Sequence, residues 1–244
     1  MKKIGAIILF FTIFPFLSKA GRETIIYNLK FGIIKGGEAR LEVSDIIFNN
    51  QKAIHYYFVG RTTGLTDKLY GVNDIYESTV DASTRLPLKS IRNIKEGKYR
   101  WYNETLYFHE NDSIYSQKSG GRKVPENLID ILSLSFYFVH HHILENMQPD
   151  YATTFPTFHA DKVDNVSVKY LGDQIIETGL GKIDCFVLVP TVDKGKVLKR
   201  SDGIRFFISK KTKLPVLLEF DMRLGVLRAE LESYIVDGKV QKAE

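Results

Sequence analysis

The most regular feature of the sequence is an alternation of apolar and polar residues with a period of two. It is clearest in TIIYNLKFGI, residues 24–33, where every odd-numbered residue is apolar and most of the others are polar or glycine. Successive side chains of a strand point to opposite faces of a sheet, so the pattern predicts a strand with one buried face. That face would carry Ile25, Tyr27, Leu29, Phe31 and Ile33.

The next segment predicts a hairpin. Lys35-Gly36-Gly37 offers two glycines that tolerate a positive φ, so we expect the turn there. The alternation resumes in ARLEVSD, residues 39–45, with Leu41 and Val43 facing inward.

Similar alternating segments follow along the rest of the chain, separated by Gly, Asn and Asp at intervals of about eight to twelve residues. This spacing is typical of an antiparallel sheet or barrel. We expect strands at residues 53–61, 72–80, 88–94, 99–108, 113–117, 166–171, 174–178, 183–189, 204–209, 216–221 and 226–236.

One segment follows a helical period instead. In PENLIDILSLSFYFVHHHILEN, Pro125 and early acidic residues precede apolar residues at helical spacing, and histidines follow near the end. These features predict a helix over residues 126–140, apolar nearly all round and therefore buried against the sheet. Residues 65–70 predict a short helical turn. The chain contains no tandem repeat or low-complexity linker, so we expect one β-rich domain over residues 21–244.

The first twenty residues have the pattern of a cleavable secretory signal. Lys2 and Lys3 precede a run without charge from Ile4 to Leu17, and the small residues Ser18 and Ala20 follow. The run is shorter than the ~20 apolar residues that span a bilayer. We therefore predict cleavage after Ala20 and a periplasmic protein, in preference to a buried N-terminal helix. No Cys follows this site and no later apolar run is long enough to span, so we expect neither a lipid anchor nor a transmembrane segment.

The charge balance changes when this segment is set aside. Removal of its three lysines leaves 31 of the 34 basic residues against 29 acidic ones, a net charge of +2 in place of +5. Basic and acidic residues alternate, and the densest basic group, residues 194–200, is typical of a solvated hairpin tip. We therefore expect no nucleic-acid partner.

The residues that could support catalysis or bind a metal do not form a known motif. Cys185 lies in an apolar strand-like run, where a buried small side chain is favoured over a nucleophile. The run 140–142, three histidines, suits the C-terminal end of a helix better than a metal site, because consecutive residues on a helix point about 100° apart. The acidic residues Asp67, Asp74, Glu77 and Asp81 are expected in turns and ion pairs. We expect no enzyme activity, no metal and no cofactor.

The aromatic content is the remaining functional signal. Tyr and Phe recur on the predicted strands, and the alternation turns many of them inward. In a small closed barrel they would fill the core, whereas in a wider sheet they would line an apolar cavity able to hold an acyl chain. The residues that we expect to line such a cavity are Tyr27, Phe31, Tyr70, Tyr76, Trp101, Phe136 and Phe206.

Five segments together resemble the bacterial envelope family called domain of unknown function 3108. They are YNLKFGIIKGGEARLEV (27–43), GLTDKLYGVNDIYESTVDASTRLPLKSIRNIKEG (64–97), IDILSLSFYFVH (129–140), GKIDCFVLVP (181–190) and FFISKKTKLPVLLEFDMRLGVLRAEL (206–231). The resemblance covers nearly all of residues 21–244. Two departures concern the last segment, where Phe206 or Phe207 replaces the family's Trp and Lys210 or Lys211 replaces an acidic residue.

The resemblance implies a fold but no assigned activity. The expected fold is mainly β, similar to the LolA/LolB lipoprotein carriers: an antiparallel curled sheet or unclosed barrel of about 10–12 strands with one central helix packed on it. In those carriers the concave face shelters acyl chains. The leading functional hypothesis is therefore a periplasmic protein that binds or carries an apolar envelope ligand, either a lipid or a lipoprotein. The alternative is a structural or interaction module of the envelope with a solid core.

Overall fold

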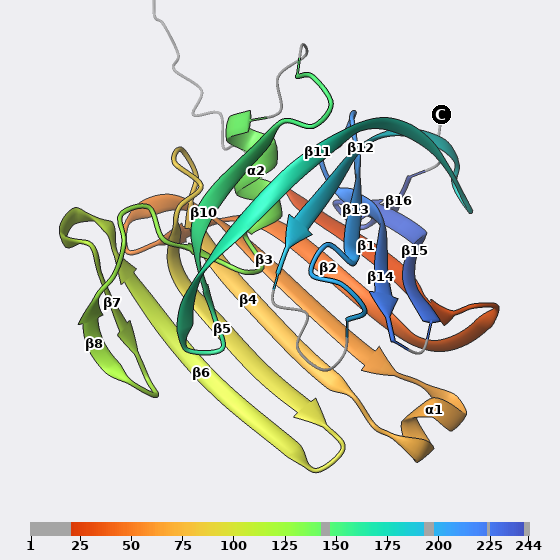
Figure 1. The fold of residues 1–244 in the computed structure, drawn as a ribbon, viewed down its shortest axis with the longest axis horizontal. Helices are drawn as coiled ribbons and strands as arrows, with labels where there is room; N and C mark the ends of the chain where they lie inside the picture. The colour runs from red at the N-terminus through yellow and green to blue at the C-terminus, as the bar shows by residue number, and fades with distance from the viewer. Residues whose placement is uncertain (1–20, 143–146, 193–197, 224, 242–244) are drawn as a thin grey trace, which may run out of the picture.

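The structure, a computed structural model, describes residues 21–142, 147–192, 198–223 and 225–241. The predicted signal peptide, residues 1–20, lies outside the described residues. The described residues form sixteen strands and two α-helices (Figure 1). The elements are β1 (Arg22–Phe31), β2 (Ile34–Phe48), β3 (Gln51–Thr62), α1 (Gly64–Leu69), β4 (Asn73–Asp81), β5 (Pro87–Glu96), β6 (Tyr99–Phe108), β7 (Ser113–Ser116), β8 (Gly120–Lys123), β9 (Ile129–Asp130), α2 (Leu134–His142), β10 (Ala152–His159), β11 (Lys162–Thr178), β12 (Gly181–Thr191), β13 (Ile204–Ser209), β14 (Pro215–Met222), β15 (Gly225–Val236) and β16 (Lys239–Val240).

All sixteen strands belong to one sheet. Its order is β8-β7-β6-β5-β4-β3-β2-β1-β15-β14-β13-β12-β11-β10-β9, with β16 paired to β15. Almost every pairing is antiparallel between strands that follow one another in the chain, and the pairing of β1 with β15 joins the two halves. The terminal strands β8 and β9 are not paired with each other in the described part of the chain, so the sheet curls without closing (Figure 1). The predicted mainly-β, unclosed architecture is confirmed.

The sheet contains more strands than the 10–12 expected. The additional ones include β8, β9 and β16, which are two to four residues long and too short to show a period. The prediction also missed β10, ATTFPTFH, whose polar and apolar positions do not alternate cleanly. The segments predicted at 166–171 and 174–178 form one strand, β11, with a register shift between Tyr170 and Gly172.

The first hairpin turns earlier than predicted. Its turn is Gly32-Ile33, where Gly32 has a φ of 59°, and Gly36 and Gly37 lie within β2. Gly37 is required there for a different reason: a Cβ at this position would lie 2.3 Å from the carbonyl oxygen of Arg61 on β3. Gly37 therefore allows the close approach of a neighbouring strand, and neither glycine of the pair forms the turn.

The central helix begins later than predicted, at Leu134 in place of residue 126. The chain before it is drawn into the sheet, because β9 pairs in parallel with β10. The side chain of Asp130 then accepts hydrogen bonds from the backbone N–H groups of Leu132 and Ser133, at 2.9 and 3.1 Å, and so turns the chain into the helix. The predicted short helical turn is confirmed as α1.

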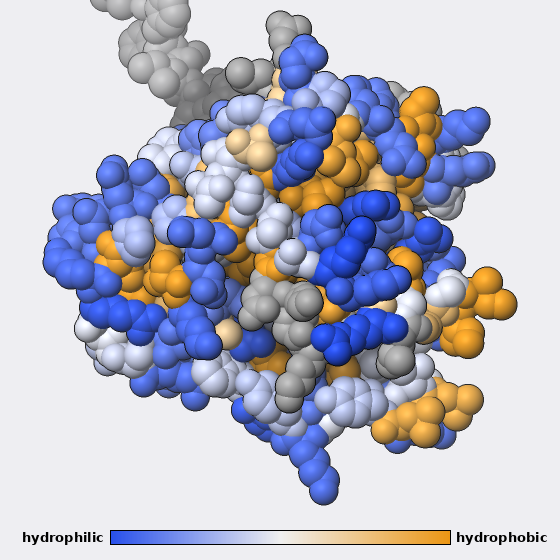
Figure 2. All heavy atoms as spheres, viewed as in Figure 1, coloured by the Kyte–Doolittle hydropathy of each residue, from blue (hydrophilic) through white to orange (hydrophobic). Residues whose placement is uncertain are grey.

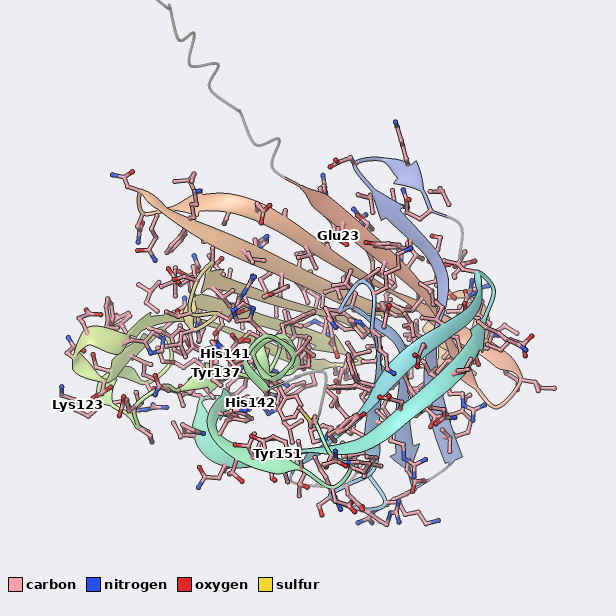
Figure 3. All side chains as sticks on the ribbon, turned by 90° about the horizontal axis from the view of Figure 1, so that it is seen from above. Glu23, Lys123, Tyr137, His141, His142 and Tyr151 are labelled. Atoms are coloured by element: carbon pink, nitrogen blue, oxygen red, sulfur yellow. The ribbon has the colours of Figure 1, made fainter. Side chains whose placement is uncertain are left out.

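Helix α2 lies inside the curl of the sheet. Figure 3 looks along this helix and shows it between the N-terminal strands on one side and β10 and β11 on the other. Its Phe136 ring stacks on Tyr56 of β3, with ring centroids 4.1 Å apart, and its Phe138 ring meets Phe155 of β10 edge-on at 6.4 Å. The helix thus contacts both halves of the curled sheet, as a central packed helix was expected to do.

Candidate functional site

An apolar cavity occupies the concave side of the sheet next to α2. Its volume is about 630 Å³, which lies in the range of small-molecule binding sites. Sixteen of its twenty-two lining residues are apolar or aromatic, and they come from both halves of the sheet and from the segment that contains α2. We call this cavity the apolar chamber. Its apolar and aromatic walls include Tyr27, Leu41, Phe58, Tyr76, Leu134, Phe136, Val166, Ile204, Phe206, Pro215, Leu218 and Phe220.

The strand register explains how these side chains meet. On the inner face of the N-terminal half, directly opposed residues form one row across six neighbouring strands. Because strands alternate faces, every member of the row points to the same side of the sheet. The row is Ile25 on β1, Leu41 on β2, Phe58 on β3, Tyr76 on β4, Arg92 on β5 and Asn103 on β6.

Four of the seven residues predicted to line a cavity do so. Tyr27, Tyr76, Phe136 and Phe206 all border the apolar chamber. Trp101 borders a smaller pocket directly beside it, which shares Tyr76 with the chamber. Chain segments more than a hundred residues apart in sequence therefore meet at one site.

The prediction was wrong for Phe31 and Tyr70. They are 41% and 54% exposed and border neither the chamber nor the pocket beside it. Phe31 ends β1 at the hairpin turn and Tyr70 directly follows α1, so both lie where strands of the sheet end. Figure 2 shows apolar residues at these strand ends, at the places where Figure 1 draws the β1–β2 hairpin and α1.

Two aromatic residues of the chamber are held firmly by the fold. Tyr27 is fully buried and its hydroxyl donates a hydrogen bond of 2.7 Å to the carbonyl oxygen of Pro215 on β14. Burial raises the pKa of Tyr27 far above its ordinary value, so the hydroxyl stays protonated. On the opposite wall, the stacking of Phe136 on Tyr56 fixes the ring of Phe136. The chamber is thus bounded by rigid groups.

A small polar pocket of about 30 Å³ adjoins the chamber on the side of β5 and β6. The two cavities share Tyr76, Ile131, Leu132 and His159. We call it the polar pocket, and its polar lining includes Ser90, Arg92, Trp101, Asn103 and Thr105. The site as a whole therefore combines a large apolar space with a small polar one.

Arg92 is the main charged group between the two cavities. Its guanidinium lies 5.8 Å from the centroid of the Tyr76 ring and 5.8 Å from that of Trp101. Its Nε donates a long hydrogen bond of 3.4 Å to the Tyr76 hydroxyl. Burial raises the pKa of Tyr76, and the positive charge of Arg92 partly opposes this rise.

His159, at the end of β10, borders both cavities. Burial, together with the positive charge of Arg92, lowers the pKa of His159 to about 4, and the carboxylate of Asp164 opposes this change. The imidazole is therefore neutral near pH 7. A neutral ring is compatible with the neighbouring guanidinium of Arg92, which would repel a protonated imidazole.

Asp130 forms the buried support of the polar pocket. Its Oδ2 accepts hydrogen bonds of 2.5 Å from the hydroxyls of both Ser78 and Ser133, and its Oδ1 accepts the two backbone bonds that lead into α2. Burial raises the pKa of Asp130, an effect that these hydrogen bonds partly oppose. The carboxyl group thereby ties β4, β9 and the start of α2 together.

Sequence reasoning missed Arg92, Asn103, His159 and Asp130 as parts of the site. The strand that carries Arg92 reads PLKSIRNIKE, in which Leu and Ile recur every third residue, so no face can be assigned from the pattern. For Asp130 a local signal existed, since an Asp side chain commonly accepts hydrogen bonds from backbone N–H groups a few residues further along and so forms a turn. The signal was hidden inside the longer predicted helix.

The remaining candidates from the sequence lie away from the chamber. Cys185 is fully buried, and burial raises the pKa of its thiol to about 12, as expected of a small core side chain. His141 and His142, labelled in Figure 3, contact the Thr84 carbonyl at 2.8 Å and the Tyr151 hydroxyl at 3.1 Å. Within the described ranges, no three His, Cys, Asp or Glu residues are grouped so that they could hold a metal ion.

The predicted acidic series forms local contacts. Asp81 accepts hydrogen bonds from Ser83 and Thr84, which lower its pKa to about 2. Asp74 accepts a bond of 3.1 Å from the backbone of Lys95, and Glu77 lies 3.1 Å from His55. These are the turn and cross-strand roles that the sequence predicted.

No helix in the described part of the chain is long and apolar enough to span a membrane. No curated protein matches the sequence. In fold, the chain is similar to the crystal structure of a beta-barrel-like protein of domain of unknown function DUF1849 from Brucella abortus, with a TM-score of 0.56 and 14% identity over 88% of this chain and 97% of that one. A family model, "Protein of unknown function (DUF3108)", matches residues 26–232. The chain therefore belongs to the DUF3108 family, as its sequence motifs indicated.

Proposed function

We propose that the protein is an exported binding or carrier protein that holds the apolar chain of an envelope ligand, a lipid or a lipidated partner, in the apolar chamber. The observation that carries this proposal is the chamber itself: about 630 Å³, bounded by aromatic and aliphatic side chains fixed on rigid elements. For scale, an apolar protein cavity of about 150 Å³ stays dry and binds benzene. A space about four times larger suits an alkyl chain.

The energetics of burial support a chain-like ligand. Each methylene group transferred from water contributes about 0.8 kcal/mol, so ten would contribute about 8 kcal/mol. A free energy of about 8 kcal/mol corresponds to a dissociation constant of about 1 μM. Part of it is lost when the ligand becomes ordered, so a chain of ten methylenes alone should bind more weakly than this. The alternative, an interaction module with a solid core, is disfavoured by the size of the chamber.

The location in the periplasm is part of the same proposal. It rests on the signal-like pattern of residues 1–20, with a basic start, an apolar run and small residues at the cleavage site. Expression of the full chain in a Gram-negative host, followed by cell fractionation and N-terminal sequencing, tests it. We expect the protein in the periplasmic fraction with Gly21 as its first residue. Recovery from the cytoplasm with Met1 intact would contradict export.

The chamber is tested by filling it. Leu218 on β14 borders the chamber, and Leu218→Trp places an indole in that space. Leu69 on α1 is 87% exposed, so Leu69→Trp adds the same bulk outside and serves as the matched control. The probe is N-phenyl-1-naphthylamine, a neutral apolar dye that fluoresces in dry sites. We expect binding by the original protein and by Leu69→Trp, and a loss of at least tenfold in affinity for Leu218→Trp.

Two results would overturn the proposal. One is the absence of dye binding by the original protein after delipidation, which would favour the interaction module. The other is equal binding by both tryptophan variants, which would place the dye elsewhere. Native mass spectrometry of the periplasmic protein adds a second readout, in which a co-purified lipid supports the proposal. Binding without turnover is proposed, so conversion of a captured lipid during incubation would count against it.

A further inference from the structure

The polar pocket contains two buried donors that have no hydrogen-bond partner among the described residues. The Nη1 atom of Arg92 and the Nε1 atom of Trp101 are both buried, and neither has a hydrogen-bond partner in the described part of the chain. Both residues line the polar pocket. Buried polar groups in proteins are almost always paired, and a charged donor is the most costly to leave unpaired. Two such donors in one pocket indicate a site for an acceptor that is not part of the chain.

The charge balance of the pocket points the same way. Arg92 forms no ion pair within the described residues. Its guanidinium lies 5.8 Å from the centroids of the Tyr76 and Trp101 rings, and its Nε donates one long hydrogen bond of 3.4 Å to the Tyr76 hydroxyl. Lys118 adds a second positive charge 4.5 Å from the centroid of the Trp101 ring. Opposite charge is the natural complement of such a position.

The carboxylates that line the pocket are already used. Glu77 lies 3.1 Å from His55, and Asp161 accepts hydrogen bonds from Ser116 and Ser119 and lies 3.6 Å from Arg122. The carboxyl oxygens of Asp130 accept four hydrogen bonds, from the hydroxyls of Ser78 and Ser133 and from the backbone N–H groups of Leu132 and Ser133. None of the three lies within ion-pair distance of Arg92.

The position of the pocket defines the shape of the missing partner. Arg92 on β5 lies directly opposite Tyr76 on β4, in the row of inward-facing residues that crosses the sheet. Tyr76 borders both the polar pocket and the apolar chamber. A molecule with its chain in the chamber would therefore reach Arg92 with one end. The pocket volume of about 30 Å³ holds a group the size of one or two water molecules, such as the two oxygens of a carboxylate.

We propose that the polar pocket is the head-group subsite for a long-chain carboxylate, whose anionic end is bound by Arg92 and Trp101 while its alkyl chain fills the apolar chamber. The proposal rests on the proposed function, since the chamber must hold the chain. The guanidinium supplies the charge and a hydrogen bond, and the indole N–H supplies a second hydrogen bond from the side. The rings of Tyr76 and Trp101 hold the guanidinium in place.

The test compares amphiphiles that differ only in the head group. The exported protein is purified, delipidated and loaded with N-phenyl-1-naphthylamine at pH 8. Displacement of the dye is then measured for dodecanoate, 1-dodecanol, dodecyl phosphate and dodecyltrimethylammonium. A charge-assisted hydrogen bond is expected to favour dodecanoate over dodecanol by about 10- to 100-fold. The larger phosphate should bind more weakly than the carboxylate, and the ammonium weakest of all.

The variants separate the head group from the chain. Arg92→Met keeps the length of the side chain and removes its charge, so affinity for dodecanoate should fall at least tenfold while affinities for dodecanol and the dye stay unchanged. Trp101→Phe, which removes one donor and keeps an aromatic ring, should lower dodecanoate affinity alone by about three- to tenfold. The matched control is Arg205→Met, because Arg205 lies on the opposite face of β13 from Phe206 and should leave every affinity unchanged.

The possible results are distinguishable. Equal affinities for dodecanoate and dodecanol, or an Arg92→Met variant that binds dodecanoate normally, would overturn the subsite and leave the chamber proposal standing. A preference for dodecyl phosphate would overturn the assignment to a carboxylate. Failure of the dye and of every amphiphile to bind would overturn the proposed function itself. If Arg92→Met does not fold, as judged by circular dichroism, the Trp101→Phe variant decides.

Discussion

The row of directly opposed, inward-facing residues that crosses β1 to β6 is apolar at one end and polar at the other. From β1 to β3 it consists of Ile25, Leu41 and Phe58, whereas on β5 and β6 it consists of Arg92 and Asn103. Tyr76 on β4 lies between them, with its ring against the chamber and its hydroxyl 3.4 Å from the Nε atom of Arg92.

The two ends differ in the interactions that their side chains require. The apolar end needs only contact, and its groups pack against one another and against Phe136. The polar end needs matched partners, and two of its buried donors have none in the described part of the chain. An apolar space can therefore accept many ligands, whereas an unpaired buried donor selects for a ligand with a matching acceptor.

The largest effect is expected when the support of the polar end is removed. Asp130→Ala would leave two buried serine hydroxyls and two backbone N–H groups without their acceptor. We expect the free energy of unfolding to fall by about 3 kcal/mol, measured by urea denaturation. Asp130→Asn retains an acceptor oxygen, so its loss of free energy of unfolding should be clearly smaller than that of Asp130→Ala. Equal losses for the two variants would show that the hydrogen bonds at Asp130 are not the cause.

The apolar end is probed by Phe136→Ala. This change removes a partly buried ring that stacks on Tyr56 and borders the chamber, so we expect a loss of about 2–3 kcal/mol in the free energy of unfolding. Because the chamber becomes larger, the preferred alkyl chain should become longer by one or more methylenes. An unchanged preference in a series of alkyl carboxylates would show that Phe136 does not limit the chamber.

The shared residue His159 gives a pH dependence with a definite sign. Its pKa is about 4 in the folded protein, against about 6.5 when unfolded, so the unfolded state binds more protons between these values. The contribution to stability is therefore complete above pH 6.5 and is lost as the pH falls toward 4. After allowance for partial exposure to solvent we expect it to be about 2 kcal/mol.

The measurement compares the original protein with His159→Gln in urea at pH 7.0 and pH 4.5. The quantity to compare is the difference in free energy of unfolding between the two proteins at each pH. The carboxyl groups titrate in both proteins, so this difference isolates the contribution of His159. A constant difference across this range would mean that His159 is not desolvated between the two cavities.

The smallest effect on stability is expected for Trp101→Phe. The indole N–H has no hydrogen-bond partner among the described residues, so its removal breaks no hydrogen bond there. Phenylalanine keeps an aromatic ring beside Arg92 and Lys118 and loses only part of a half-buried side chain. We expect the free energy of unfolding without ligand to change by less than about 1 kcal/mol, although dodecanoate binding weakens. A large loss of stability would show that the N–H bonds to a buried water and does not await a ligand.

Much of the fold was predictable from local pattern. The period-two alternation located most of the long strands, because a sheet with one buried face imposes that period on the sequence. The same argument correctly turned Tyr27 and Tyr76 inward. It failed for Phe31, which ends β1 at the hairpin turn, where an inward direction no longer means burial. It did not apply to Tyr70, which directly follows α1 and belongs to no strand.

The position of the helix shows a second limit. Residues 126–133 have apolar residues at helical spacing, yet β9 pairs with β10 and Asp130 starts the helix later. The partner strand β10 is more than twenty residues further along the chain, so the local sequence carries no information about it. Tertiary pairing overrode the local propensity.

The class of fold, the family and the inward direction of most of the aromatic residues follow from the sequence alone, because each depends on residues that are neighbours in the chain. The unfilled chamber beside α2, and the pocket that Arg92 and Trp101 share at its edge, could be seen only in the folded protein. Packing volume and hydrogen-bond pairing depend on the register of strands far apart in sequence, which local patterns do not specify. A one-residue shift of β5 would turn Arg92 out to solvent and remove the polar end of the site.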